Sequence, residues 1–297
     1  MTAYKKINRV FKSSVHIPID DRSRIVLISD CHRGDADNSD DFAQNQNVYF
    51  AALTKYFEED FTYIEIGDGD EMWKNKNFSN ITDQHSDVFW LLNKFYKNCR
   101  FIMIYGNHDM IKKKREWVQK NLTAFRDDRD DSHVPLFPNI HVHEGIILDY
   151  KNNNILLTHG HQIDLINSQW WRLGRFLVRH LWRPLELIGV KDPTSASRNQ
   201  NKKISVEKKL SEWAAKEHKM LVVGHTHRPA FPNVGDTMYF NDGSVVHPRC
   251  MTAIEISGGT IALVKWSVKT RPSGVLYVGR DVLAGPNRLD EFFGFDN

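Results

Sequence analysis

One stretch of the chain is the most informative about the fold: Leu221-Val222-Val223-Gly224-His225-Thr226-His227-Arg228-Pro229. Its apolar start predicts a short buried strand that stops at a glycine. Two histidines, two residues apart, then follow in the turn. Alone, such a pair is either an ordinary strand end or half of a metal site.

Four apolar runs upstream end in the same way, with Asp, Asn or His directly after the run. Ile25–Ser29 precedes Asp30-Cys31-His32, Tyr63–Ile66 precedes Gly67-Asp68, Phe101–Tyr105 precedes Gly106-Asn107-His108-Asp109, and Ile155–Thr158 precedes His159-Gly160-His161. Each pair taken singly is also explained by a turn, a helix cap or a buried histidine. The ordered set instead predicts a metal site built where strands leave the edge of a sheet.

The spacing of the runs predicts an α/β fold. Strands at 25–29, 62–66 and 100–105 alternate with helices expected at about 41–59, 83–97 and 110–123. After Pro138 the pattern is mostly β, with strands at 141–143, 145–150, 155–158, 220–223, 237–241, 251–256 and 260–268. Residues 1–23 are expected to be a polar lead-in. We expect one domain over residues 1–297, with two packed mixed sheets, outer helices, a helical insertion at about 162–219 and a surface tail from about 271.

Composition and charge limit the function classes. The chain has 297 residues, of which 41% are hydrophobic and 26% charged, and its net charge of +3 does not by itself imply a polyanionic partner. Three scattered cysteines argue against a disulfide framework. The start of the chain has no apolar signal-peptide core, and no apolar run approaches the roughly 18 residues of a membrane span. These features favour a cytoplasmic protein.

The strand-exit residues offer a mixed set of nitrogen and oxygen ligands. Asp30 and His32 can turn toward the same space, Asp68 can bridge two ions through its two carboxylate oxygens, and Asn107 offers a carbonyl oxygen. His159, His225 and His227 offer imidazole nitrogens. A set without thiolate suits Mn, Fe or Zn in a site that assists hydrolysis.

This ordered set resembles the calcineurin-like metallophosphoesterases over residues 25–267. The resemblance implies a four-layer α/β/β/α sandwich with two divalent metals, most simply Mn or Fe/Zn. It implies one metal on Asp30, His32, Asp68 and His227, and the other on Asp68, Asn107, His159 and His225. It further implies that His108 contacts the scissile phosphate and helps to protonate the leaving oxygen, while Asp109 orients His108. The implied reaction is attack of a metal-activated hydroxide on a phosphomonoester or phosphodiester.

Two local patterns are similar to one branch of that family. Gly-Asp-x-x-Glu-x-Trp over Gly67–Trp73, together with Gly-His-Thr-His-Arg-Pro, resembles the UDP-2,3-diacylglucosamine pyrophosphohydrolases. A nucleotide- or lipid-linked pyrophosphate is therefore one expected substrate. The sequence departs from the branch at His108, where arginine is usual, and at His161, where aspartate is common. His161 is open to two interpretations, as a partner of the site or as a solvated loop histidine.

The insertion contains an amphipathic pattern between Trp170 and Arg183. Arg172, Arg175, Arg179 and Arg183 fall on one stripe of a helix, opposite Trp170, Leu173, Leu177 and Leu181. This pattern fits a surface helix with a basic face in water, or an interfacial helix on an anionic membrane or a lipid-like substrate. Arg198, Lys202 and Lys203 are candidate phosphate contacts, with solvated charge as the alternative. The basic run 112–115 is read as solvated.

Two other functions compete with phosphoester hydrolysis of a small substrate. A nuclease would use the same ligand set, but the chain has no long Lys/Arg track with interleaved aromatic residues. A metal-free scaffold would retain the fold while losing ligands, whereas all seven positions are filled here. Nucleic acid is therefore not the expected partner.

Overall fold

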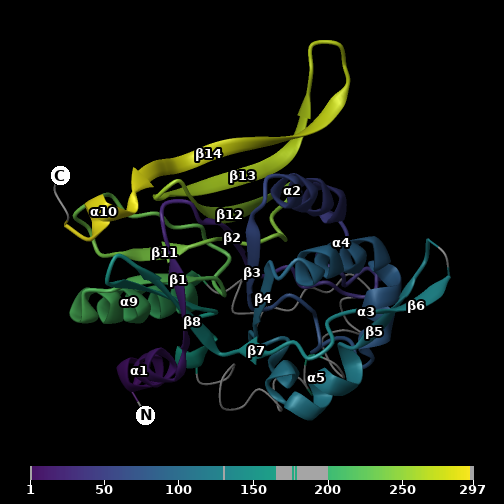
Figure 1. The fold of residues 1–297 in the computed structure, drawn as a ribbon, viewed down its shortest axis with the longest axis horizontal. Coiled ribbons are helices and arrows are strands. Elements are labelled where there is room, and N and C mark those ends of the chain that lie inside the picture. The colour runs from purple at the N-terminus through teal and green to yellow at the C-terminus, as the bar shows by residue number, and fades with distance from the viewer. Residues whose placement is uncertain (1, 130, 165–175, 177, 179–199, 295–297) are drawn as a thin grey trace.

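The structure is a computed structural model that describes residues 2–129, 131–164, 176, 178 and 200–294. Two mixed sheets form its centre (Figure 1). The larger sheet has the strand order β14 (Leu276–Arg288), β13 (Thr260–Thr270), β12 (Cys250–Ser257), β2 (Arg24–Ile28), β3 (Thr62–Ile66), β4 (Phe101–Ile104) and β7 (Val142–His143). The smaller has the order β1 (Val15–Ile19), β8 (Gly145–Tyr150), β9 (Asn153–Thr158), β10 (Met220–Val223) and β11 (Tyr239–Asn241).

Helices cover the outer faces of the two sheets. The α-helices are α1 (Ala3–Ser13), α2 (Gln46–Glu58), α3 (Phe78–Gln84), α4 (Ser86–Lys97), α5 (Arg115–Asn121), α9 (Gln200–Glu217) and α10 (Leu289–Phe292). Short 3₁₀ helices lie at Met110–Lys113 and His161–Ile163, and β5 (Ala124–Asp127) pairs with β6 (Ser132–Pro135) as a separate hairpin.

Strand β2 shows why the layers stack as they do. Successive side chains of a strand point to opposite faces. Ile25 and Leu27 join the apolar core between the two sheets, whereas Val26 and Ile28 join the core beneath α2 and α4. A strand that is covered on both faces has to be apolar throughout. A third core lies between the smaller sheet and helices α1 and α9, and it contains Trp213. The chain is thus a four-layer α/β/β/α sandwich, as the sequence predicts.

The direction of the strands brings the polar strand exits together. Strands β2, β3 and β4 are parallel neighbours, and so are β9 and β10 in the smaller sheet. The carboxyl ends of parallel strands lie at one edge of a sheet. The predicted site is therefore shared by two sheets, and it does not lie on the edge of a single sheet.

Several elements differ from the sequence-based expectation. Residues 1–23 form α1 and the edge strand β1, because the helix buries Ile7 and Val10 against the smaller sheet. The expected helix at 83–97 is two helices, and the one expected at 110–123 is a 3₁₀ turn followed by α5. Residues 276–288, which the sequence analysis placed in a surface tail, pair with β13 as the edge strand β14. This long hairpin projects from the body in Figure 1.

The insertion is described only in part. Its last part is helix α9, while residues 165–175, 177 and 179–199 lie outside the described residues. The amphipathic stripe predicted between Trp170 and Arg183 therefore stays a prediction. Within the described residues, none of the helices combines the length and the apolar character that crossing a membrane requires.

Candidate metal centre

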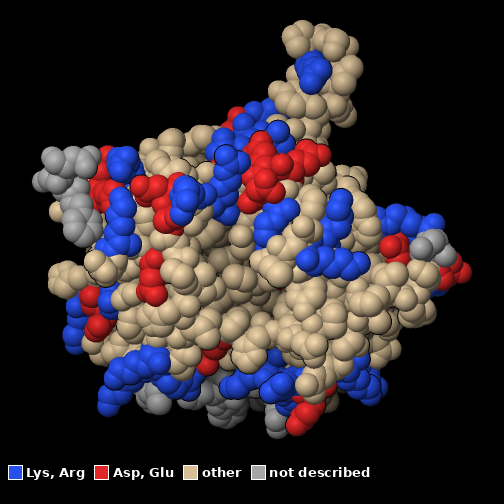
Figure 2. Space-filling view, in the orientation of Figure 1, with Lys and Arg blue, Asp and Glu red and all other residues tan. Residues whose placement is uncertain are grey.

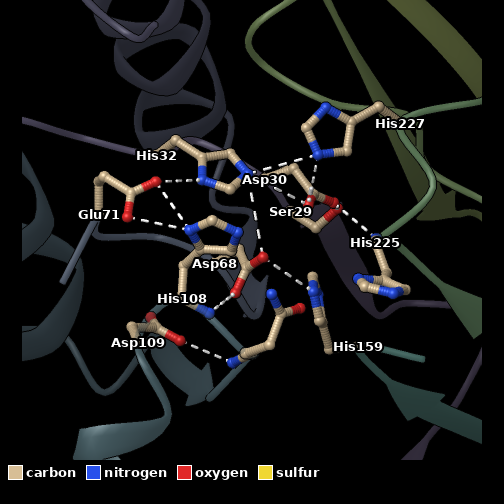
Figure 3. A network of polar contacts seen from close by, with 12 residues as sticks. Ser29, Asp30, His32, Asp68, Glu71, His108, Asp109, His159, His225 and His227 are labelled. Atoms are coloured by element: carbon tan, nitrogen blue, oxygen red, sulfur yellow. Dashed lines mark hydrogen bonds and ion pairs between the residues drawn. The ribbon is translucent and has the colours of Figure 1, made fainter. Parts of the chain in front are cut away.

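Most of the proposed ligands have an unusual backbone conformation. Asp30, His32, Asp68, His225 and His227 all have positive φ, between 50° and 68°. This left-handed region is sparsely populated by residues other than glycine. Such strain costs on the order of 1–3 kcal/mol per residue and persists only where the surroundings fix it, which is common at functional sites. At these strand exits the side chains turn toward one another (Figure 3).

Asp30, His32 and His227 form the first group of candidate ligands. Asp30 Oδ1 lies 3.0 Å from His227 Nε2 and 3.5 Å from His32 Nε2, and the two Nε2 atoms are 3.3 Å apart. These side chains come from the exits of β2 and β10. The two sheets therefore contribute to one cluster, which we call group one.

Asp68, His159 and His225 form the second cluster, called group two. Asp68 Oδ2 lies 3.1 Å from His159 Nε2, and the ring centroids of His159 and His225 are 5.1 Å apart. The His159 ring is fixed through its other nitrogen, since Nδ1 lies 2.9 Å from the Ile66 carbonyl oxygen. A proton on Nδ1 leaves Nε2 as the nitrogen that faces the site.

One oxygen of Asp68 connects the two groups. Asp68 Oδ2 also lies 3.9 Å from His32 Nε2 in group one. Asp68 Oδ1 is occupied, because it accepts a hydrogen bond of 2.7 Å from the backbone N–H of His108. The sequence analysis expected Asp68 to bridge through both oxygens, whereas the structure presents Oδ2 alone to both groups.

The donor atoms fit divalent cations. Within the described part of the chain, Asn107 Oδ1 and His225 Nε2 are buried and have no hydrogen-bond partner. Asp30 Oδ1 and His159 Nε2 are also buried, and their contacts go to other candidate ligands. Buried polar atoms in proteins are nearly always hydrogen-bonded, so two unpaired donor atoms beside this cluster need an explanation. Oxygen and imidazole nitrogen are ligands suited to Mn, Fe or Zn.

Protonation in the metal-free protein follows from the burial of these groups. Burial alone would lower the pKa of His159, but the charges of Asp68 and Asp30 outweigh it and raise this pKa to about 9. Burial and the neighbouring His159 lower the pKa of His225 to about 3. Burial opposes the charged form of Asp30, yet His227 and His159 hold its pKa well below the usual range. Group two thus contains one protonated and one neutral histidine before any metal binds.

Glu71 is the carboxylate that contacts His108. Its Oε1 and Oε2 lie 2.9 and 2.8 Å from His108 Nδ1, and Oε2 lies 3.2 Å from His32 Nδ1. Trp73 adds a second constraint, since its ring stacks on His108 at 4.5 Å and its Nε1 donates to the Asn107 carbonyl oxygen. Gly-Asp-x-x-Glu-x-Trp therefore positions His108. The sequence analysis used Glu71 and Trp73 only as part of a pattern that resembles one branch of the family.

Asp109 does not have the role that the sequence analysis gave it. Its Oδ1 accepts a hydrogen bond from the Gly106 N–H at 2.6 Å, and its Oδ2 lies 2.8 Å from Lys112 Nζ. Asp109 therefore shapes the loop that carries Asn107 and His108. The orientation of the His108 ring is set by Glu71.

A buried ion network lies behind the loops of the site. Lys112 Nζ bridges Asp109 and Asp70 at 2.8 and 2.6 Å, and Asp70 Oδ1 accepts a hydrogen bond from Arg33 Nε at 2.7 Å. Arg33 also pairs with Glu65 on β3 at 2.8 Å. All five side chains are buried. The sequence analysis placed Lys112 in a solvated basic run, and this was wrong because three nearby carboxylates compensate its charge inside the protein.

The structure describes only some of the predicted substrate contacts. Lys203 is half-buried on α9, and burial together with Arg228 lowers its pKa. Arg198 lies outside the described residues, and so does the side chain of Lys202. His161 is only 2% exposed, with its ring centroid 5.5 Å from that of His159. The interpretation of His161 as a solvated loop histidine was wrong.

Sequence analysis missed the residues that hold Gly224-His225-Thr226-His227 and Asp30 in place. Asn241, at the end of β11, donates from Nδ2 to the Gly224 carbonyl oxygen at 2.7 Å. Asp242 contacts Ser29, which precedes Asp30. Asn241-Asp242-Gly243 follows a predicted strand in the same way as the metal motifs do, and this signal was present in the sequence.

Fold and site together define a hydrolase of the phosphoesterase type with His/Asp groups that can hold metal ions. The family model for calcineurin-like phosphoesterases matches residues 23–229, and the chain belongs to this family.

The other comparisons add little to this assignment. Among solved structures, a conserved uncharacterized protein from Streptococcus pneumoniae TIGR4, a predicted phosphoesterase, is similar at 15% identity and a TM-score of 0.36. The alignment covers 87% of this chain and 98% of that one, and a similarity at this TM-score carries no argument here. A search of curated proteins gave no significant match.

Proposed function

We propose that the protein is a dinuclear metal-dependent phosphoesterase. The observation that carries this proposal is the pair of groups that share Asp68 Oδ2, with Asn107 Oδ1 and His225 Nε2 buried and unpaired among the described residues. Asp30, His32, Asp68 and His227 would hold one cation. Asp68, Asn107, His159 and His225 would hold the other. Manganese, iron or zinc would suit these ligands.

The chain's own residues define how a phosphate ester would be handled. Two bound cations would polarise the phosphoryl oxygens and lower the pKa of a bound water. The Glu71 carboxylate contacts Nδ1 of His108. Nε2 is therefore the nitrogen left to contact the phosphate and to protonate the leaving oxygen. Trp73 keeps the imidazole in one plane, and Asp109 holds the loop on which it sits.

A nucleotide- or lipid-linked pyrophosphate is the substrate class that we propose. Its support is the resemblance of two sequence patterns to UDP-2,3-diacylglucosamine pyrophosphohydrolases, together with basic side chains near group one. Arg228 directly follows His227 of group one, and it pairs at 3.1 Å with Glu207 on α9, the helix that also carries Lys203. Membrane-surface contact through residues 170–183 and a cytoplasmic location stay predictions.

The nuclease alternative has less support. On the face drawn in Figure 2, acidic and basic side chains are interspersed over the described residues and do not form a continuous basic track. Nucleic-acid binding depends on clustered positive charge and weakens steeply with salt. A nuclease would show this salt dependence in the assay below.

The test combines metal content with a substrate panel. Metal per chain is measured after dialysis against Mn²⁺, and turnover is compared on aryl phosphomonoester, aryl phosphodiester, UDP-linked lipid and single-stranded DNA. We expect two Mn²⁺ per chain and hydrolysis of a small phosphate ester or pyrophosphate. Asp68→Ala should abolish turnover and lower bound metal, while Asp236→Ala, in an exposed turn, should change neither.

Three results would overturn parts of this proposal. Wild-type turnover by Asp68→Ala would exclude Asp68 as the carboxylate that two cations share. Less than one metal per chain with no activity on any ester would favour the metal-free scaffold. Cleavage of DNA alone, falling steeply with salt, would favour the nuclease.

A further inference from the structure

Asp242 is a buried carboxyl group for which the proposed chemistry has no use. It follows β11 and is fully buried. Its backbone N–H donates to the Val223 carbonyl oxygen at 3.1 Å, next to the turn that carries His225 and His227. Its Oδ1 lies 2.7 Å from Ser29 Oγ, while Oδ2 has no hydrogen-bond partner in the described part of the chain.

Ser29 connects Asp242 to a proposed metal ligand. Ser29 Oγ lies 2.5 Å from Asp30 Oδ2. The same Asp30 oxygen accepts a second hydrogen bond, from the backbone N–H of His225 at 2.8 Å (Figure 3). Two donors therefore hold Oδ2, and Oδ1 is the oxygen of Asp30 that faces His32 and His227 in group one.

The number of available protons decides which group donates the hydrogen bond in each of these contacts. A serine hydroxyl has one proton and can donate to only one of the two carboxyl groups beside it. A proton on Asp242 Oδ1 completes both contacts, since Asp242 then donates to Ser29 and Ser29 donates to Asp30. Burial and the negative charge of Asp30 raise the pKa of Asp242 well above its usual value, in agreement with this direction.

The surroundings leave little freedom for another arrangement. A side chain at Gly224 would place its Cβ 2.0 Å from Ser29 Oγ and 2.6 Å from Asp30 Oδ2. Asn241 holds the Gly224 carbonyl oxygen from the other side. Asp242, Ser29 and Asp30 thus lie in a closely packed junction between β10 and β11 of one sheet and β2 of the other.

We propose that Asp242 is a positioning residue that acts through Ser29 to fix the Asp30 carboxylate, so that Oδ1 is presented to a metal in group one. The inference rests on the metal site proposed above. Partners that orient a metal ligand typically contribute about 10- to 100-fold to metal affinity. Because both sheets contribute, the same contacts also couple the packing of the sheets to the geometry of the site.

The test is the affinity of the full-length, metal-stripped protein for Mn²⁺, measured by isothermal titration calorimetry. We expect Ser29→Ala and Asp242→Ala each to weaken one of two binding steps by about tenfold or more. Asp242→Asn keeps an N–H donor toward Ser29 and should restore affinity to within a few fold of wild type. Asp236→Asn makes the same chemical change in an exposed turn and serves as the control.

The double variant Ser29→Ala/Asp242→Ala distinguishes a connected chain from two separate structural effects. If Asp242 acts through Ser29, the double variant should bind Mn²⁺ as Ser29→Ala does. Additive losses would overturn the inference, as would wild-type affinity in Ser29→Ala. If Asp242→Ala does not fold, the single variants decide the question: wild-type affinity in Ser29→Ala, or a loss of about tenfold or more in Asp242→Asn, would overturn the inference.

The same Mn²⁺ titration distinguishes the absence of the proposed metal site from the absence of a role for Asp242. Wild-type protein that binds no Mn²⁺ would remove the site itself and the inference with it. Two Mn²⁺ in the wild type, with unchanged affinities in Ser29→Ala and Asp242→Ala, would leave the site standing and overturn only the role of Asp242.

Discussion

The Glu71 carboxylate lies 2.8 Å from Nδ1 of His108, and it is buried while His108 is partly open to solvent. Burial opposes the charge on Glu71, but His108 and His32 outweigh this effect and hold its pKa well below the usual range. An anionic Glu71 accepts the Nδ1 proton and leaves His108 Nε2 for the substrate. His108 is thus prepared for proton transfer before substrate binds.

Glu71→Gln should lower kcat in a way that depends on the leaving group. An amide cannot match the charged acceptor, so we expect a loss of about 10²-fold with a poor leaving group such as an alkyl alcohol, within the range of general acid catalysis. The loss should be much smaller with p-nitrophenol, which needs no proton. The same kcat comparison on His108→Asn should give the same pattern. A uniform loss on both substrates would contradict the assignment.

Metal-free protein should lose stability as the pH rises through the range in which His159 titrates. The pKa of His159 is raised to about 9 from an ordinary value of 6.5. A raised folded-state pKa means that the contribution to stability is complete below about pH 6.5 and is lost as the pH approaches 9. Thermal unfolding of EDTA-treated protein between pH 6 and 9.5 measures this. His159→Gln should flatten the profile, whereas exposed His218→Gln should leave it unchanged.

Metal binding should have the opposite pH dependence. Imidazole binds a cation in its neutral form, so below about pH 9 a metal on His159 displaces a proton. Mn²⁺ affinity should therefore rise with pH up to about 9. Calorimetry in two buffers of different ionisation enthalpy counts the released protons. Binding without proton release at pH 7 would contradict the protonated state of His159.

Gly224→Ala should damage the site by steric overlap. The new Cβ would lie 2.0 Å from Ser29 Oγ, where no ordinary contact is possible. We expect the free energy of unfolding to fall by about 1–3 kcal/mol, as for overpacked cores, and Mn²⁺ affinity to fall with it. Gly279→Ala is the control, because the nearest atoms there belong to the flexible Lys269 side chain. Equal effects of the two changes on metal affinity would count against the explanation.

Lys112→Met should be strongly destabilising. Removing the charge leaves Asp70 and Asp109 buried without their shared partner. Breaking a buried ion pair in this way costs about 3–5 kcal/mol. Urea denaturation measures the change in the free energy of unfolding. Lys113→Met, at the exposed neighbouring position, should stay within about 0.5 kcal/mol of wild type.

The sequence alone determined the layers of the fold and the order of the strand exits. Both are local properties: buried parallel strands have to be apolar, and Asp, Asn or His directly after such a strand has to lie at the edge of its sheet. For this reason the positions of Asp30, Asp68, His159 and His225 in the chain were enough to place each of them at a strand exit, while the resemblance of the ordered set to a family implied that they share one site. Helix α1 and strand β14 could not be predicted in this way. Their apolar residues are few, and the two elements are stabilised by packing on the smaller sheet and by pairing with β13, respectively.

Only the tertiary structure decided which groups hold these ligands in place. The family resemblance implied Asp109 as the residue that orients His108, whereas the packing of two loops selects Glu71. Lys112 is expected to be solvated from the sequence, but the fold buries it between the carboxylates of Asp70 and Asp109. Asp242 reaches Asp30 through Ser29 across more than 200 residues of sequence. Such contacts depend on the meeting of two sheets, and no local pattern records which side chains will meet there.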